Sequence, residues 1–152
     1  MREHCKFWIC FCLFLCGCNF FHYQLPLENV NILVDKNANF TNAIALDLVI
    51  ICDEKLNEDI SKLSAVQYFE KKQDLISSNQ DNILVWHWEV VPGQQLKNLP
   101  ITFNEFDPVG GYIFASYNNK SCNRIKIPRS KEIKIILKKQ NYQVLAVQEV
   151  VE

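Results

Sequence analysis

Cys18 is the residue whose surroundings point most directly to a covalent reaction. It follows Gly17 behind an apolar run from Phe7 to Leu15, and the head of that run carries Arg2 and Lys6. A thiolate is a strong nucleophile, and a small residue before it leaves room for a processing enzyme to approach. The pattern therefore makes the Cys18 thiolate a candidate for covalent modification.

The first 17 residues have the organisation of a cleavable export signal. Their apolar run is roughly half the ~20 residues that a membrane-spanning helix needs. The segment Leu15-Cys16-Gly17-Cys18 resembles the bacterial lipobox, with a branched residue at −3, a small one at −1 and cysteine at +1. The lipobox resemblance implies that the Cys18 thiolate accepts a diacylglyceryl group, after which the chain is cut in front of it. We therefore predict a signal peptide over residues 1–17 and a lipidated tether over 18–28. Two alternatives stay open: an ordinary secretory signal in which Cys18 is incidental, and an uncleaved buried strand.

The sequence offers no candidate catalytic residue. His22 lies in the predicted tether, and His87 faces away from Trp86 and Trp88 on a predicted strand. Glu89 is expected on the opposite face from His87, so no partner for a general base is indicated. Metal-ligand spacings such as CxxC, HxxxH and the calcium loop are missing. We therefore expect no enzyme activity, no metal, no cofactor and no small-molecule substrate.

Trp86 and Trp88 share one face of the predicted strand and have two interpretations. Their rings could stack on sugar rings, which would make the chain a glycan-binding protein. They could equally fill the core of a sheet, which is the interpretation we favour.

Cys52 and Cys122 are the two cysteines beyond the leader. An exported chain reaches an oxidising compartment, where the two thiols could pair. Such a disulfide would close a ~70-residue loop and add on the order of 4 kcal/mol of stability. The sequence leaves the pairing open.

Charge is unevenly distributed along the chain. Residues 18–152 carry 14 basic and 16 acidic side chains, which does not fit a nucleic-acid-binding protein. Glu28 to Asp107 holds 13 acidic and 6 basic residues, whereas Lys120 to Lys139 holds 8 basic and 1 acidic. The basic segment is a second candidate interaction surface, for an acidic partner or for phospholipid headgroups, or else a solvated strand face.

Length and hydropathy indicate one domain, since 152 residues with 49% hydrophobic side chains support a single core. Ser64 and Gln67 form a capping-box pattern before a helix over 65–76, within a helical insertion at about 57–80. Alternating apolar patterns predict strands at 31–34, 43–52, 83–91, 99–106, 109–117, 124–127, 132–135 and 142–150. The segments 124–127 and 132–135 are expected to form a hairpin. The pattern favours a mainly β domain over residues 29–152, a two-sheet β-sandwich with one helical insertion.

The order of short motifs resembles a known family. A long apolar strand (Ile44 to Ile50) precedes a helix with an aromatic pair and a Leu-Ile (Tyr68-Phe69 to Leu75-Ile76). Then come Val91-Pro92-Gly93-Gln94, a Gly-aromatic strand (Val109 to Tyr117) and Arg124-Ile125-Lys126-Ile127-Pro128. Together with the lipobox, this order is similar to that of TssJ (SciN-type) lipoproteins of the type VI secretion system, from about Val30 to Val147.

The resemblance implies a transthyretin-like sandwich and a non-enzymatic role. The protein would sit on the periplasmic face of the outer membrane. Asn19 favours the same location, because enteric lipoproteins that stay in the inner membrane carry an aspartate at this position. Its partner would be the periplasmic domain of a TssM-type inner-membrane protein. The resemblance assigns partner binding to the loop Asp35, Lys36, Asn37, Ala38, Asn39, Phe40, Thr41 and Asn42. This loop is shorter than in the family, and Asn123 replaces the family's aromatic residue before the arginine. A secretin pilot lipoprotein and a glycan-binding lipoprotein remain as alternatives.

Overall fold

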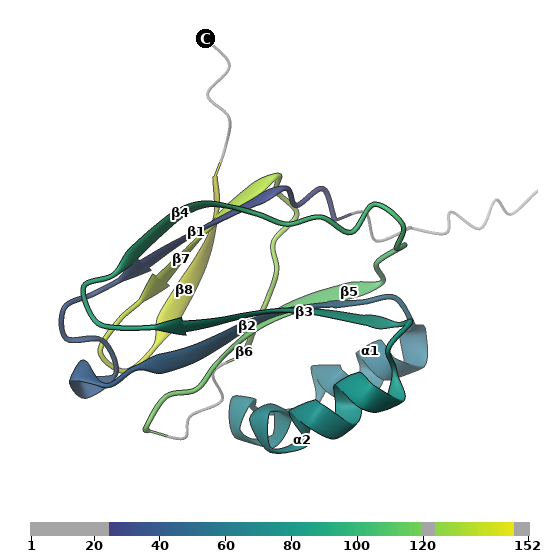
Figure 1. The fold of residues 1–152 in the computed structure, drawn as a ribbon, viewed down its shortest axis with the longest axis horizontal. Coiled ribbons are helices and arrows are strands. Elements are labelled where there is room, and N and C mark those ends of the chain that lie inside the picture. Colours follow the sequence, from purple (N-terminus) through teal and green to yellow (C-terminus); the bar gives the residue numbers. More distant parts are fainter. Residues whose placement is uncertain (1–24, 120–123, 148–152) are drawn as a thin grey trace, which may run out of the picture.

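The computed structural model describes residues 25–119 and 124–147, in which two four-stranded sheets pack face to face and two helices cover one of them (Figure 1). The predicted signal peptide and Cys18 lie outside the described residues. The elements are β1 (Asn29–Val34), the 3-10 helix η1 (Ala38–Thr41), β2 (Ile44–Ile51), α1 (Glu54–Ser61), α2 (Ala65–Ser78), β3 (Ile83–Val90), β4 (Gln95–Pro100), β5 (Gly110–Ala115), β6 (Arg124–Lys126), β7 (Glu132–Leu137) and β8 (Tyr142–Val147).

The strand order confirms the predicted two-sheet sandwich. One sheet has the order β4-β1-β7-β8 and the other β3-β2-β5-β6. β1 and β7 pair in parallel, whereas the other paired strands are antiparallel. Side chains between the sheets form the main core, and a second cluster lies between the β3-β2-β5-β6 sheet and the helices.

The predicted hairpin of 124–127 and 132–135 is wrong, because its two strands belong to different sheets. β6 pairs with β5, whereas β7 pairs with β1 and β8. Both ends of the connection are fixed: the Ile127 N–H donates to the Gly111 carbonyl, and the Asn29 N–H donates to the Lys131 carbonyl. The segment therefore crosses from one sheet to the other.

β2 is the central element of the fold, because both of its faces are buried. Leu46, Leu48 and Ile50 point into the core between the sheets, whereas Val49 and Ile51 point toward the helices. This double burial explains why the strand is almost continuously apolar. It also places the one acid of the strand, Asp47, beneath the helices at 0% exposure.

The capping box of α2 is confirmed, since Ser64 and Gln67 each bond the other's backbone N–H. The helix α1 was not predicted, and it overlaps only the start of the helical insertion expected at about 57–80. α1 begins with Asp53, whose side chain accepts from the Leu56 N–H, and it buries only Leu56 and Ile60. Two apolar positions in eight residues are a weak periodic signal.

The predicted strand 99–106 is also wrong, because the observed strand β4 covers Gln95–Pro100 and overlaps the predicted range only at Leu99 and Pro100. β4 pairs with β1 through a register shift, and Asn98 adopts a left-handed conformation with a φ of 52°. The Asn98 N–H donates to the Asn31 side chain instead of a strand backbone. This irregularity breaks the period-2 pattern from which strands are predicted.

The packed domain starts before β1. Leu25 and Leu27, which fall in the predicted tether, are 5% and 3% exposed in the main core. Within the described ranges, no helix is long and apolar enough to cross a membrane.

Candidate functional site

Four connections meet at one end of the sandwich, which we call the loop end. They are Asp35–Ala43 after β1, Val91–Gln94 before β4, Ser116–Asn119 after β5, and Lys138–Asn141 between β7 and β8. Backbone hydrogen bonds join them: the Val34 N–H donates to the Gln94 carbonyl, and the Asn39 N–H to the Lys138 carbonyl. The described chain begins at the opposite end of the sandwich (Figure 1).

The predicted partner-binding loop has an uncommon backbone. Asn39, Phe40 and Thr41 have φ values of 45°, 53° and 70°, all in the left-handed region. Such a conformation costs about 1–3 kcal/mol per non-glycine residue, and it persists only where the surroundings enforce it. Strained backbone of this kind is concentrated at functional sites.

Asn39 supplies that enforcement. It is 1% exposed, its side-chain amide donates to the Ala43 carbonyl at 3.0 Å, and its oxygen accepts from the Asn118 N–H at 2.8 Å. The Asn42 side chain adds bonds to the carbonyls of Asn39 and Phe40. The buried amide therefore ties the loop both to itself and to the connection after β5.

Phe40 is the side chain that this loop presents to solvent. It is 44% exposed, and the Lys139 ammonium lies 5.2 Å from its ring centroid. Val91, 53% exposed, is a second large apolar side chain of the loop end. Exposed aromatic side chains flanked by cations are common anchors of protein–protein contacts.

The structure divides the eight predicted partner-binding residues into two groups. Ala38 and Asn39 are buried and can act only through the loop's shape. Lys36, Asn37, Phe40, Thr41 and Asn42 are exposed and Asp35 is half-buried, so these remain available for contact.

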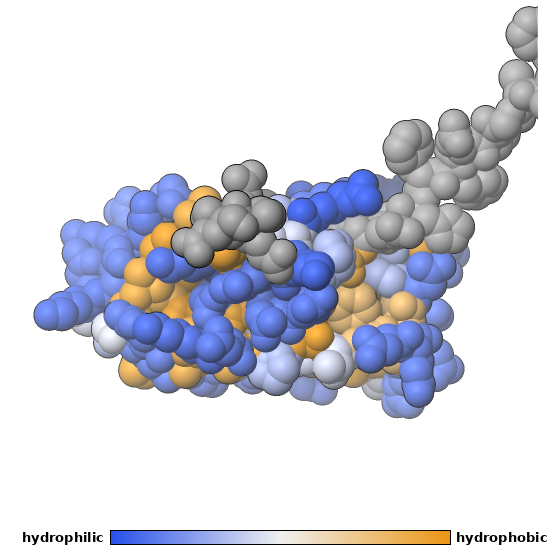
Figure 2. Space-filling view, turned by 90° about the horizontal axis from the view of Figure 1, so that it is seen from above, coloured by the Kyte–Doolittle hydropathy of each residue, from blue (hydrophilic) through white to orange (hydrophobic). Residues whose placement is uncertain are grey.

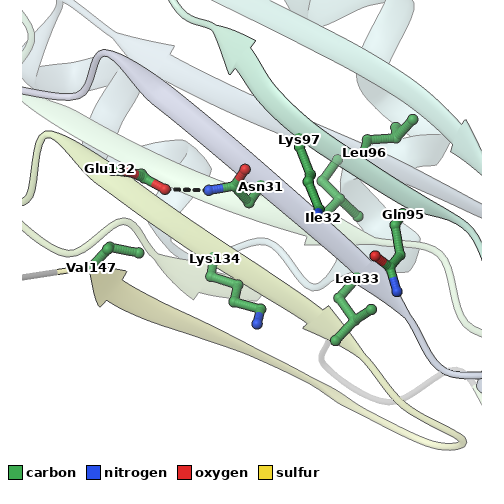
Figure 3. Close-up of a pocket in the computed structure, with 9 residues that line it drawn as sticks. All are labelled: Asn31, Ile32, Leu33, Gln95, Leu96, Lys97, Glu132, Lys134 and Val147. Carbon is green, nitrogen blue, oxygen red and sulfur yellow. Dashed lines mark hydrogen bonds between the residues drawn. The ribbon is translucent and has the colours of Figure 1, made fainter.

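The sequence analysis did not predict Val91 as a site residue. Its position directly before the turn residues Pro92-Gly93 was the available signal that this valine lies in a connection. The basic segment is only partly a separate surface, because Lys138 and Lys139 lie beside the loop. Lys134, by contrast, lies on the outer face of the β4-β1-β7-β8 sheet (Figure 3).

His87 has partners that the sequence did not indicate. Asp47 lies opposite it on β2, and the Asp47 Oδ1 is 2.5 Å from the His87 Nδ1. The Lys72 ammonium is 2.7 Å from the Asp47 Oδ2, and the Tyr68 hydroxyl donates to that oxygen at 2.8 Å. The expectation that Glu89 faces away is wrong: residues two apart on a strand share a face, and its Oε1 is 3.5 Å from the His87 Nε2.

This cluster fastens α2 to the sheet. The Tyr68 ring stacks on Phe114 at 4.1 Å, with an angle of 9° between the ring planes. Burial, together with the charge of Asp47, raises the pKa of Tyr68 well above its ordinary value, so the hydroxyl stays a donor. Among the described residues, no group of three or more His, Cys, Asp or Glu side chains could hold a metal ion.

Trp86 and Trp88 belong to the core-facing side of β3. Both are half-buried against the core between the sheets, and the Trp86 ring meets Phe103 edge to face at 6.5 Å. Their recorded partners are thus side chains of this chain, which agrees with the core interpretation.

Cys52 is half-buried just after β2, and burial together with the nearby Asp107 carboxylate raises the pKa of its thiol. Cys122 lies outside the described residues, so the pairing that the sequence leaves open is not decided by a contact. The sheet register weighs against it, because Arg124 pairs with Phe114 and Phe114 with Asp47, five residues before Cys52. The Cα atoms of Cys52 and Arg124 are therefore about 19 Å apart.

The two residues from Arg124 to Cys122 span about 7 Å, and a disulfide needs Cα atoms within about 7 Å. We therefore expect both thiols to react with an alkylating agent in the unfolded, unreduced protein, as measured by mass spectrometry. A cross-linked peptide containing Cys52 and Cys122 would contradict this expectation.

No protein-family model and no curated protein sequence matches this chain significantly. Solved structures do match. The type VI secretion lipoprotein TssJ1 from Pseudomonas aeruginosa is 14% identical with a TM-score of 0.59, over 78% of this chain and 94% of that one. Lip of Serratia marcescens, a membrane-bound component of the type VI secretion system, is 15% identical with a TM-score of 0.56, over 80% and 99%.

A chain of a type VI membrane complex matches at 11% identity with a TM-score of 0.59, over 80% of this chain and 99% of that one. At such identities the likeness concerns the fold. The chain thus has the helix-covered β-sandwich fold of TssJ-type secretion lipoproteins, as the family resemblance of its motifs predicted.

Proposed function

We propose that this chain is a non-enzymatic lipoprotein of a type VI secretion membrane complex. A lipid on Cys18 would hold it at the periplasmic face of the outer membrane, and its loop end would bind the periplasmic domain of a TssM-type inner-membrane protein. The observation that carries this proposal is Phe40, exposed on a left-handed loop that the buried Asn39 holds in place. The shared fold with type VI secretion lipoproteins supports the same assignment.

The positions of the two ends suit such a role. β1 leads from the end where the described chain begins to the loop end, and its six residues span about 20 Å. A lipid attached through the preceding segment would therefore leave the loop end directed away from the membrane. An inner-membrane partner would approach from that side.

The loop end also defines the chemistry of its partner. Phe40 requires an apolar pocket, and the Lys139 ammonium beside its ring favours carboxylates at the rim of that pocket, as does the exposed Lys36 of the same loop. Buried aromatic anchors dominate the binding energy of such contacts, whereas rim charges mainly raise the association rate.

Replacing Phe40 with alanine should weaken binding to the periplasmic domain of a TssM-type protein by about 2 kcal/mol, or roughly 30-fold. The measurement is a binding titration with purified proteins. Leu145→Ala is the matched control for partner binding, because Leu145 is similarly exposed, at 47%, but lies on the outer face of β8 and outside the loop end. If Phe40→Ala binds as tightly as the parent, the interface does not include Phe40. If no periplasmic domain of a TssM-type protein binds the parent, the proposal is refuted.

A further inference from the structure

The outer faces of the two sheets differ in what covers them. α1 and α2 cover the β3-β2-β5-β6 sheet, whereas no described element covers the outer face of the β4-β1-β7-β8 sheet (Figure 1). Figure 2 looks toward this second sheet and shows apolar patches between polar side chains. A groove of about 440 Å³ lies on it. Figure 3 shows residues that line this groove, among them Asn31, which bonds Glu132, and Val147 of β8.

The two edges of this sheet are unlike each other. β4 carries Lys97, the left-handed Asn98 and Pro100, which are features that prevent further strand pairing. β8 has the sequence Tyr-Gln-Val-Leu-Ala-Val, without a charge, a proline or a glycine. Among the described strands, β7 is its one neighbour in the sheet. β8 is therefore an edge that lacks the usual protection.

The β7–β8 register shows which backbone groups point toward the open side. The Lys138 N–H donates to the Asn141 carbonyl at 2.8 Å, so this pair closes the hairpin with a hydrogen bond. Hydrogen-bonded and non-hydrogen-bonded pairs alternate along an antiparallel ladder. The backbone groups of Val144 and Ala146 consequently point away from β7.

The side chains of β8 are also incompletely covered. Leu145 and Val147 lie on the outer face of the sheet and are 47% and 36% exposed. They are two of the four large hydrophobic side chains that stand out as exposed among the described residues, and the other two, Phe40 and Val91, lie at the loop end.

We propose that two copies of this chain pair antiparallel through their β8 edges, about a twofold axis at Leu145. In this register Val144 of each copy exchanges backbone hydrogen bonds with Ala146 of the second copy. Leu145 faces Leu145 of the second copy in a non-hydrogen-bonded pair, the kind with the closest side chains.

A second copy fits this edge because the strand is self-complementary. It has no charge that its own copy would oppose, and its open hydrogen-bonding pairs and exposed apolar side chains match across the axis. The contact is a single strand pair, so it is weak in dilute solution. At a membrane, lipid anchors would raise the local concentration of the two copies. That gain rests on the proposed function, whereas the pairing geometry does not.

The test is disulfide cross-linking of the full chain in membranes, with Leu145→Cys against Lys134→Cys as the matched control. Lys134 lies opposite Leu145 on β7, so its copies would be about 14 Å apart, too far for a disulfide. Leu145→Cys should give roughly tenfold more cross-linked dimer, since its Cα atoms lie at a disulfide distance. Equal yields, or cross-linking of position 145 mainly to another protein, would overturn the proposal.

Charge variants test the twofold register directly. Two differently tagged copies should cease to co-purify when both carry Leu145→Lys or both carry Leu145→Glu, and should co-purify again when one carries each. Ala146→Pro should abolish the dimer while thermal melting stays near that of the parent, because the lost N–H points away from β7. A dimer that survives Ala146→Pro, or that does not return in the mixed pair, would refute the pairing.

The two proposals fail separately. Phe40→Ala should leave the cross-link at position 145 unchanged, because Phe40 lies at the loop end. If partner binding is absent but the cross-link at position 145 forms, the dimer proposal holds and the partner proposal fails. If the partner binds but the cross-link does not form, only the partner proposal holds.

Discussion

Replacing Asp47 with alanine is expected to lower the free energy of unfolding by about 3–5 kcal/mol, because it breaks a buried ion pair from one side. Asp47 is 0% exposed and accepts bonds from Lys72 and Tyr68 while also contacting His87. Its removal leaves the Lys72 ammonium, itself 16% exposed, and the Tyr68 hydroxyl without their acceptor. The measurement is the urea midpoint of the variant against that of the parent.

The chain contains a matched control for this prediction. Glu58 and Lys62 also form an ion pair with an N–O distance of 2.7 Å, but their side chains are 69% and 62% exposed. Glu58→Ala should therefore change the midpoint little, because solvent screens an exposed pair. If Asp47→Ala shifts the midpoint no more than Glu58→Ala does, the cluster does not hold α2 to the sheet.

A second comparison separates the cost of leaving Lys72 without its partner from the net stability that the Asp47–Lys72 ion pair contributes. The double variant Asp47→Leu with Lys72→Met removes both charges and puts apolar side chains in their place. It should recover part of the stability that Asp47→Ala loses, since no ammonium is left buried alone. A double variant that is less stable than Asp47→Ala would show that the ion pair itself contributes net stability.

Local signals in the sequence predicted those parts of the fold that local rules determine. The capping box at Ser64 located the start of α2, and the apolar run of β2 marked a strand, which the structure buries on both faces. α1 was largely missed because it has two buried apolar positions. The false hairpin arose because adjacent apolar segments read as neighbours, whereas the parallel pairing of β7 with β1 joins residues about 100 positions apart.

For the candidate site, the sequence offered a position through the family resemblance but no detail of its structure. The family resemblance pointed to the loop after β1, yet asparagine is mostly a surface residue, so nothing marked Asn39 as buried. His87 and Asp47 are 40 residues apart and meet only through the register of β2 and β3. Exposed side chains such as Val91 and Lys139 join the loop end through tertiary contacts, which short motifs do not encode.

Asn39→Ala is expected to destabilise the chain by about 2–4 kcal/mol, because it combines two costs. The Ala43 carbonyl and the Asn118 N–H lose their partner, and a residue with a Cβ that lacks asparagine's local bonds must hold a φ of 45°. Asn39→Gly loses the same hydrogen bonds but tolerates the left-handed conformation. It should therefore be about 1 kcal/mol less destabilising than alanine in the same urea titration. Equal midpoints for the two variants would show that the backbone of this loop stores no strain.

The same variant links the shape of the loop to partner binding. Asn39 is 1% exposed, so it cannot contribute contact area to a partner, whereas Phe40 can. If the left-handed loop holds Phe40 ready for its pocket, Asn39→Ala weakens partner binding without removing a contact, because the loop must then be ordered on binding. The affinity of Asn39→Ala for the partner should fall by less than that of Phe40→Ala. The double variant should bind only slightly more weakly than Phe40→Ala alone. Full additivity of the two losses would mean that Asn39 acts on something other than the placement of Phe40.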